Sequence, residues 1–234
     1  MGARTPLSVL IKDFTEGSGM CFFTNFNSSV GFRAKLEQVS KSYGSYRKIR
    51  PDGNCFYRAY LFGIFEVALS KGPDAVAKLG SKFKELAEEC KSTYDSFAID
   101  EFQELFEEQI QTLVDKSDMS LIFSDSSIDG YLIALMRCIC GAALKRWSDE
   151  YTPFLPSEYA TIESFCRAEV DPMYRDCDQL QIVALTRILH VPIDIIYLDQ
   201  SEQELAIHSF GDEASGQRIP LLYKPGHYDL LYPL

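Results

Sequence analysis

The sequence lacks paired cysteines, which bears on both disulfides and metals. Its seven cysteines are irregularly spaced and form no Cys-x-x-Cys pair. An odd, irregular set is not typical of a disulfide framework. Cys138 and Cys140 lie in a predicted helix, where residues two apart point to different faces, so a zinc site there is disfavoured. We expect no metal or other cofactor, and most cysteines are interpreted as small buried hydrophobic residues in a reducing compartment.

The sequence also lacks a long apolar run. The densest apolar stretch, from Tyr131 to Leu144, is interrupted by Arg137 and is shorter than a membrane span. The first residues carry no secretion-type apolar stretch, and Pro6 stands where a myristoylation signal needs Ser or Thr. These absences predict a cytoplasmic protein with no membrane partner, and they leave a nuclear location open.

Basic residues are outnumbered, with 23 Lys and Arg against 34 Asp and Glu, for a formal charge of −11. Such a surface repels a phosphate backbone, so nucleic acid is not an expected partner. Hydrophobic residues make up 46% of the 234 positions, which suits one globular domain with a large core. Residues 1–30 are rich in small polar residues and predict an irregular lead-in, followed by a single, monomeric domain over residues 31–234.

Helical spacing dominates the front of the chain and strand-like alternation the back. Helices are predicted over residues 32–41, 74–94, 100–114, 128–147, 164–169 and 178–189. Strands are predicted over residues 192–198, 204–210, 219–223 and 227–232, with a short extended segment at 45–49. This order is typical of an α+β domain and not of alternating βαβ units.

The segment Asp-Gly-Asn-Cys-Phe-Tyr-Arg, residues 52–58, places a cysteine between a turn and a helix. Asp-Gly-Asn favours a turn, and residues 56–65 are apolar enough for a buried helix. Cys55 would then lie in the first helical turn, where unpaired N–H groups favour a thiolate and can receive an oxyanion. The pattern predicts a nucleophile, with a buried structural thiol as the alternative.

Histidine is scarce, and one of the three residues suits a base for this cysteine. His190 follows a predicted helix and His208 lies in an alternating strand, which indicates structural roles. His227 stands two residues before Asp229, so the two side chains share one face of a strand. The carboxylate would orient the imidazole toward a thiol. The alternative is an ordinary surface pair on an edge strand.

The two segments together resemble the signature segments of one family. Residues 52–58 and 225–232 (Pro-Gly-His-Tyr-Asp-Leu-Leu-Tyr) resemble those of the ovarian-tumour (OTU) cysteine proteases, most closely the otubain branch. Residues 169–173 and 191–199 are also otubain-like, and the resemblance extends over residues 35–234. It implies an OTU-type, papain-like α+β fold, with a small, mostly antiparallel C-terminal sheet packed between helical layers.

By this resemblance the protein is a deubiquitinating enzyme, which hydrolyses isopeptide bonds between the C-terminal glycine of ubiquitin and lysine. The resemblance makes Cys55 the nucleophile, His227 its general base and acid, and Asp229 the residue that orients His227. Asp52 would support the oxyanion site, with the backbone N–H of Cys55 as donor. Ubiquitin and polyubiquitin chains are the implied partners, with ubiquitin-conjugating enzymes as further ones.

Two departures from the otubain pattern bear on ubiquitin contacts. Otubains usually have Glu where this chain has Asp171, and Asp-His-Ile where it has residues 178–180, Asp-Gln-Leu. Gly53 and Gly226 lack a Cβ and are predicted to line a narrow channel for the ubiquitin tail. Two alternatives stay open: a non-catalytic ubiquitin-binding scaffold, and a protease for a ubiquitin-like modifier.

Overall fold

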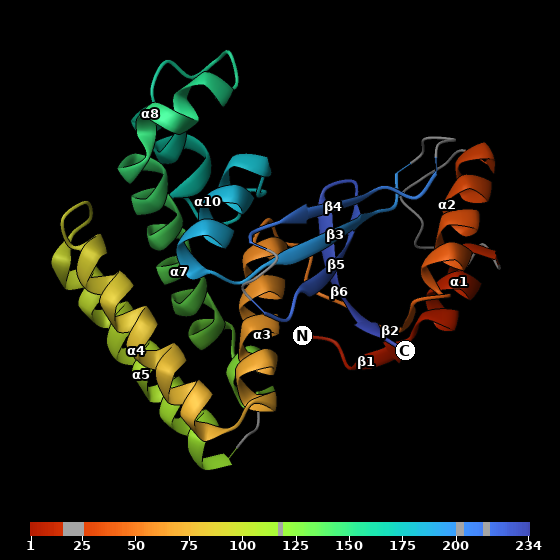
Figure 1. The fold of residues 1–234 in the computed structure, drawn as a ribbon, viewed down its shortest axis with the longest axis horizontal. Coiled ribbons are helices and arrows are strands. Elements are labelled where there is room, and N and C mark those ends of the chain that lie inside the picture. The colour runs from red at the N-terminus through yellow and green to blue at the C-terminus, as the bar shows by residue number, and fades with distance from the viewer. Residues whose placement is uncertain (16–25, 117–118, 200–203, 213–215) are drawn as a thin grey trace.

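A six-stranded sheet separates two groups of helices in the computed structural model (Figure 1), which describes residues 1–15, 26–116, 119–199, 204–212 and 216–234. The strand order is β1-β2-β6-β5-β3-β4, and all neighbours are antiparallel except the β3–β5 pair. The strands are β1 (Arg4–Pro6), β2 (Tyr43–Arg47), β3 (Ile193–Tyr197), β4 (Ile207–Phe210), β5 (Ile219–Lys224) and β6 (His227–Pro233). The predicted mostly antiparallel sheet is therefore confirmed.

Most helices pack on one side of the sheet, and α1 and α2 lie on the other (Figure 1). The long helices are α1 (Leu7–Thr15), α2 (Phe26–Val39), α3 (Cys55–Ser70), α4 (Pro73–Cys90), α5 (Ser96–Lys116), α7 (Ser126–Arg146) and α10 (Gln179–Leu189). Short helical segments are α6 (Ser120–Ser124), α8 (Ser148–Tyr151), η1 (Thr152–Phe154), α9 (Ile162–Phe165) and the π-helix η2 (Cys166–Val170). The predicted α+β class, with a sheet between helical layers, is confirmed.

The N-terminal segment belongs to the fold, so the prediction of an irregular lead-in over residues 1–30 is wrong where the structure describes it. Strand β1 pairs with β2, and Leu7 and Leu10 of α1 are buried against sheet residues such as Leu222. A helix of nine residues is marginal in water by itself, and it becomes stable only where a sheet face covers its apolar side. The sheet is likewise not wholly C-terminal, because β1 and β2 form one end of it. Residues 16–25 of the predicted lead-in lie outside the described part of the chain.

Helix α7 runs through the centre of the helical group and contacts α3, α4, α5 and α10. By length and composition it could cross a membrane, but 61% of its apolar window is buried inside the protein. Two charged side chains on it, Asp129 and Arg137, are also fully buried. They are eight residues apart and therefore lie on the same face of the helix. That face meets the loop that precedes α3.

Candidate active site

Cys55 is the first residue of α3, and its side chain is almost completely buried, with 3% exposed. The preceding Asn54 occupies the N-cap position but makes no capping hydrogen bond with its side chain. The N–H groups of the first turn are therefore not consumed by the usual cap. The N–H groups of Phe56 and of Tyr228, on β6, are directed at the cysteine sulfur. The predicted position at a helix start is confirmed.

The ionisation of Cys55 differs from the sequence-based prediction. Burial raises the pKa of the thiol to about 11, and the carboxylates of Asp176 and Asp52 add to the rise. The N–H groups of Tyr228 and Phe56 lower the pKa but do not compensate for the lost hydration. The N–H groups at the helix start thus favour a thiolate, as predicted, but burial outweighs them. The thiol is neutral at pH 7 and needs a base to become a nucleophile.

His227 and Asp229 lie on one face of β6, as predicted. The Nε2 atom of His227 is 2.9 Å from Oδ1 of Asp229, and the acid is completely buried. Burial alone would raise the pKa of Asp229, but the hydrogen bond from His227 and the charge of Lys224 bring it below its usual value. The backbone N–H of Ile49 donates to the same Oδ1 at 2.8 Å. The carboxylate is therefore ionised and fixed in position.

The second ring nitrogen of His227, Nδ1, is available to interact with a thiol, because Nε2 interacts with Asp229. Nδ1 is buried and has no hydrogen-bond partner within the described part of the chain. The rings of Tyr228 and Phe56, the residues that follow His227 and Cys55, contact each other at 5.3 Å between centroids. The structure thus brings β6 against the start of α3, and joins the histidine to its acid, without a Cys55–His227 hydrogen bond.

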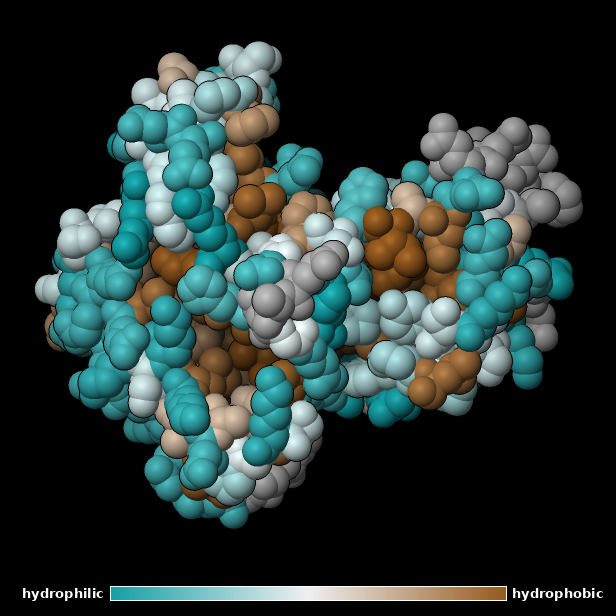
Figure 2. Space-filling model, in the orientation of Figure 1, coloured by the Kyte–Doolittle hydropathy of each residue, from teal (hydrophilic) through white to brown (hydrophobic). Residues whose placement is uncertain are grey.

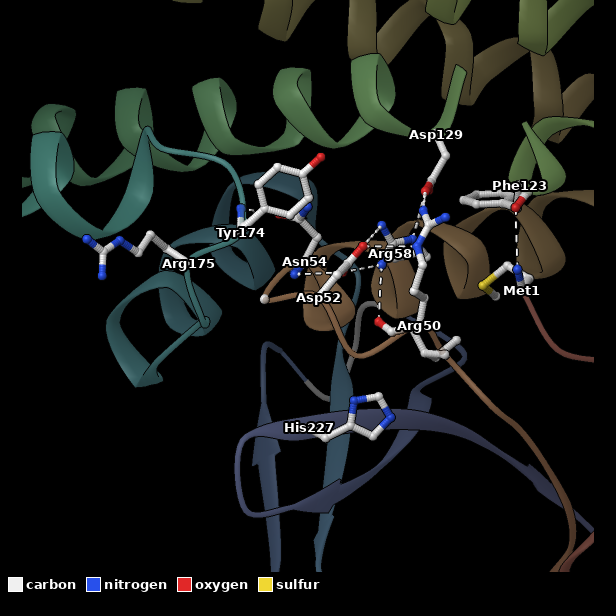
Figure 3. Close-up of polar contacts among 12 residues, drawn as sticks. Met1, Arg50, Asp52, Asn54, Arg58, Phe123, Asp129, Tyr174, Arg175 and His227 are labelled. Atoms are coloured by element: carbon white, nitrogen blue, oxygen red, sulfur yellow. Dashed lines mark hydrogen bonds and ion pairs between the residues drawn. The ribbon is translucent and has the colours of Figure 1, made fainter. Parts of the chain in front are cut away.

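Asp52 lies in the loop before α3, with both carboxylate oxygens occupied (Figure 3). Oδ1 accepts from the N–H of Asn54 at 3.1 Å and from Arg58 at 2.8 Å. Oδ2 accepts from Arg58 at 2.9 Å and from Arg50 at 3.0 Å. A carboxylate held in this way cannot itself donate to an oxyanion. Its contribution is to hold the loop that carries the N–H of Cys55.

Asn54 and Arg137 form a buried junction that the sequence reasoning missed. Oδ1 of Asn54 accepts from Nη2 and Nε of Arg137, at 2.7 and 3.1 Å, and from the N–H of Tyr174 at 3.1 Å. The same guanidinium donates to the backbone carbonyls of Gly53, Val170 and Arg175, at 3.0, 3.0 and 2.6 Å. It also lies 4.3 Å from the centre of the Tyr57 ring. Arg137 thus joins residues 50–54 before α3, which we call the catalytic loop, to the segment before α10.

Asp129, the other buried charged residue on α7, forms an ion pair with Arg58. Arg58 is 1% exposed, and its Nε donates to both oxygens of Asp129 at 2.8 and 3.0 Å. Arg50 also pairs with Asp129, so two arginines and two carboxylates form one closed network around the loop. The available signal was the presence of two charged residues, Asp129 and Arg137, in the apolar stretch of residues 128–144.

Gly53 does not line a channel for a substrate, so that part of the sequence-based prediction is wrong. A Cβ at this position would lie 2.3 Å from the carbonyl oxygen of Tyr174. Gly53 also has φ +71, and Tyr174 has φ +66. The space above Gly53 is therefore filled by the chain's own backbone. Gly226, with φ +73, has no atom within 4 Å of its Cβ position among the described residues.

A Gly53→Ala variant is expected to lower the free energy of unfolding by about 3 kcal/mol, because strained φ costs about 1 kcal/mol and the backbone clash about 2 more. Gly226→Ala is the matched control, since it has the same φ strain and no clash, and should lose about 1 kcal/mol. Urea unfolding of both variants measures the difference. Equal losses of unfolding free energy in the two variants would show that the backbone of Tyr174 does not exclude a Cβ at residue 53.

The remaining histidines have structural positions, as predicted. His190 is the C-cap of α10 with φ 55, and His208 lies on the exposed edge strand β4, with its ring 4.6 Å from that of Tyr197. Among the described residues, no group of three or more His, Cys, Asp or Glu could hold a metal ion. Cys21 lies outside the described residues, and the other six cysteines are free thiols.

The matching family model is the one described as Peptidase C65 Otubain, and it covers residues 9–233. The chain belongs to the otubain family. Human ubiquitin thioesterase OTUB1 is 32% identical over 98% of this chain and 81% of its own length. The OVARIAN TUMOR DOMAIN-containing deubiquitinating enzyme 1 of Arabidopsis thaliana is 29% identical over 100% of this chain and 80% of its own length.

Solved structures of relatives have the same fold as this otubain. A structure described as a ceOTUB1 ubiquitin aldehyde UBC13~Ub complex matches with a TM-score of 0.87 and 27% identity, over 100% of this chain and 93% of that one. A second complex, h/ceOTUB1-ubiquitin aldehyde-UBCH5B~Ub, matches with a TM-score of 0.86 and 28% identity, over 99% of this chain and 89% of that one. The predicted resemblance to the otubain branch is therefore confirmed.

Proposed function

We propose that this otubain hydrolyses the isopeptide bond between the C-terminal glycine of ubiquitin and a lysine side chain, with Cys55 as the nucleophile. The observation that carries the proposal is the meeting of α3 and β6. It places a buried thiol at a helix start that packs against β6, the strand on which His227 is joined to a buried acid at 2.9 Å. Relatives that match nearly the whole chain are named ubiquitin thioesterases and a deubiquitinating enzyme.

The reaction begins with proton transfer from the Cys55 thiol to Nδ1 of His227, because the thiol is neutral at pH 7. The sulfur attacks the glycyl carbonyl, and the oxyanion is received by N–H groups at the start of α3, including that of Cys55. The imidazolium then protonates the departing lysine amine. A water molecule, deprotonated by His227, releases ubiquitin from the thioester. Asp229 orients the ring throughout, and Asp52 holds the loop.

The ubiquitin body is proposed to dock in an apolar groove beside the start of α10. The groove has a volume of about 500 Å³ and lies between α8–η1 and the start of α10, where Figure 2 shows apolar surface. Phe154 is 71% exposed there. Asp178 lies at the other side of the groove. Two residues earlier in the chain, the carboxylate of Asp176 acts electrostatically on Cys55. Apolar lining residues are Tyr151, Phe154, Pro156, Phe165, Leu180 and Val183.

Phe154→Ala is expected to lower kcat/KM for di-ubiquitin about tenfold, mainly through KM, because an exposed aromatic anchor contributes on the order of 1–2 kcal/mol to docking. Phe97→Ala is the control, because Phe97 is also 71% exposed but lies at the start of α5. Steady-state cleavage with both variants gives the comparison. A loss confined to kcat, or an equal loss in Phe97→Ala, would contradict docking in this groove.

A panel of C-terminal electrophilic probes tests the proposed function. Wild-type protein is incubated with probes made from ubiquitin and from several ubiquitin-like modifiers, and the labelled residue is located by mass spectrometry. Labelling of Cys55 by the ubiquitin probe is the expected result. Labelling by another modifier alone would favour a different protease specificity, and no labelling at all would favour a non-catalytic ubiquitin-binding scaffold.

Ubiquitin-conjugating enzymes are proposed as further partners. The support comes from the relatives whose structures are described as complexes with UBC13~Ub and UBCH5B~Ub. The catalytically inactive Cys55→Ala variant, added to a ubiquitin-transfer assay, separates this role from cleavage. A slower transfer in its presence supports the partnership, and an unchanged rate opposes it.

A further inference from the structure

The carboxylate of Asp229 has a cationic partner that the proposed reaction does not use. Nζ of Lys224 lies 2.6 Å from Oδ2 of Asp229, while His227 and the N–H of Ile49 share Oδ1. The lysine side chain is 19% exposed and the acid 0%. A lysine that reaches into a buried site loses side-chain freedom and hydration, so its charge must interact strongly with the acid there.

The hairpin between β5 and β6 builds Lys224 into this position. Lys224 pairs directly with His227 in the strand register, and only Pro225 and Gly226 connect them. Gly226 has φ +73, which a two-residue turn of this kind requires at its second position. Cross-strand neighbours are about 5 Å apart at Cβ, so the two side chains approach one carboxylate from two sides.

We propose that Lys224 is a positioning residue of this site, acting through Asp229, and that its charge lowers the pH at which the Cys55 thiol ionises. The inference rests on the proposed function, since it assigns a role within the Cys55–His227 pair. A nearby positive charge favours a thiolate and disfavours an imidazolium. Removing that charge therefore disfavours ionisation of the Cys55 thiol, and the active pH range moves upward.

Other ionisable groups lie around Cys55 and His227, but none of those named below supplies a positive charge in place of Lys224. Asp52, Asp176 and Asp229 carry carboxyl groups, and Cys177, Tyr223 and Tyr228 carry a thiol or phenol group, so Lys224 is the cation among these residues. Arg50 and Arg58 pair with Asp52 and Asp129 on the other side of the catalytic loop. The groups come from the loop before α3, the segment before α10, β5 and β6: Asp52, Asp176, Cys177, Tyr223, Lys224, Tyr228 and Asp229.

The test is the pH dependence of Cys55 alkylation by iodoacetamide, followed by mass spectrometry of the peptide that contains Cys55. In Lys224→Met the midpoint of the rate profile is expected to rise by about one pH unit relative to wild type. Lys224→Arg keeps the charge and should keep the wild-type midpoint. Lys78→Met, at an exposed position of α4, is the control for removal of a distant positive charge and should also keep it.

A lower alkylation rate with an unmoved midpoint in Lys224→Met would overturn the proposal, because it would assign only a structural role to the lysine. A shifted midpoint in Lys224→Arg would overturn it as well. Lys224→Gln is a second neutral variant, and circular dichroism checks that each variant is folded. If both neutral variants unfold, Lys224 serves stability and the proposal fails.

Alkylation does not involve ubiquitin, so this result is independent of the substrate. Wild-type protein that cleaves di-ubiquitin, combined with an unmoved midpoint in the neutral variants, would remove the Lys224 inference and leave the proposed function. A moved midpoint in a protein that no ubiquitin probe labels would support the role of Lys224 and contradict the proposed function.

Discussion

Cys55→Ala is expected to abolish di-ubiquitin cleavage, with a loss of at least about 10⁴-fold, while the protein stays folded. The loss is large because the substitution removes the atom that attacks the glycyl carbonyl, and no other thiol takes its place. The cost in stability is small, on the order of 1 kcal/mol, because a buried sulfur is replaced by a hydrogen in a well-packed helix start. Gel analysis of di-ubiquitin, together with circular dichroism, measures both effects.

Cys138→Ala is the matched control for this variant. Cys138 is a partly buried free thiol on α7, remote from the start of α3 in the chain. Its replacement should leave the cleavage rate within about twofold of wild type, because the side chain contributes packing alone. Cleavage by Cys55→Ala at a rate comparable to that of Cys138→Ala would refute the assignment of the nucleophile.

Arg137→Met is expected to lower the free energy of unfolding by about 4 kcal/mol, and to impair cleavage even below the unfolding temperature. The guanidinium is 1% exposed and donates to Asn54, Gly53, Val170 and Arg175. Methionine fills much of the volume but leaves these oxygens buried without donors. The catalytic loop and the segment before α10 would then lose their common support.

Arg146→Met provides the comparison, since Arg146 ends the same helix but is 57% exposed at its side chain and pairs with Glu89. An exposed ion pair contributes at most about 1 kcal/mol, so this variant should unfold near the wild-type denaturant concentration. Chemical denaturation and steady-state cleavage are measured for both variants. Similar midpoints for Arg137→Met and Arg146→Met would show that the buried junction contributes little.

Local patterns allowed much of the site to be predicted. Asp-Gly-Asn before an apolar run indicated a helix start at Cys55, and α3 begins there. The spacing of His227 and Asp229 indicated one face of a strand, and their side chains meet at 2.9 Å. These predictions succeeded because turn chemistry and the two-residue period of a strand depend on neighbouring residues.

Other features depend on residues far apart in the sequence and were missed. Arg137 was interpreted only as an interruption of an apolar run, and Asp129 was not considered. Gly53 was assigned to a substrate channel, because nothing local indicates that the backbone of Tyr174 lies above it. The short helix α1 was read as irregular, because its burial depends on the face of a sheet formed mostly by later strands.

By itself, the sequence determined the chemical identities at the site: a thiol at a helix start, a histidine with an acid two residues on, and the family to which they belong. The tertiary structure decided the state of these groups. It buries Cys55, which raises the pKa of the thiol to about 11, and it places Lys224 against Asp229. The physical reason is that hydration and charge–charge distance depend on which segments pack together, and local spacing does not specify that packing.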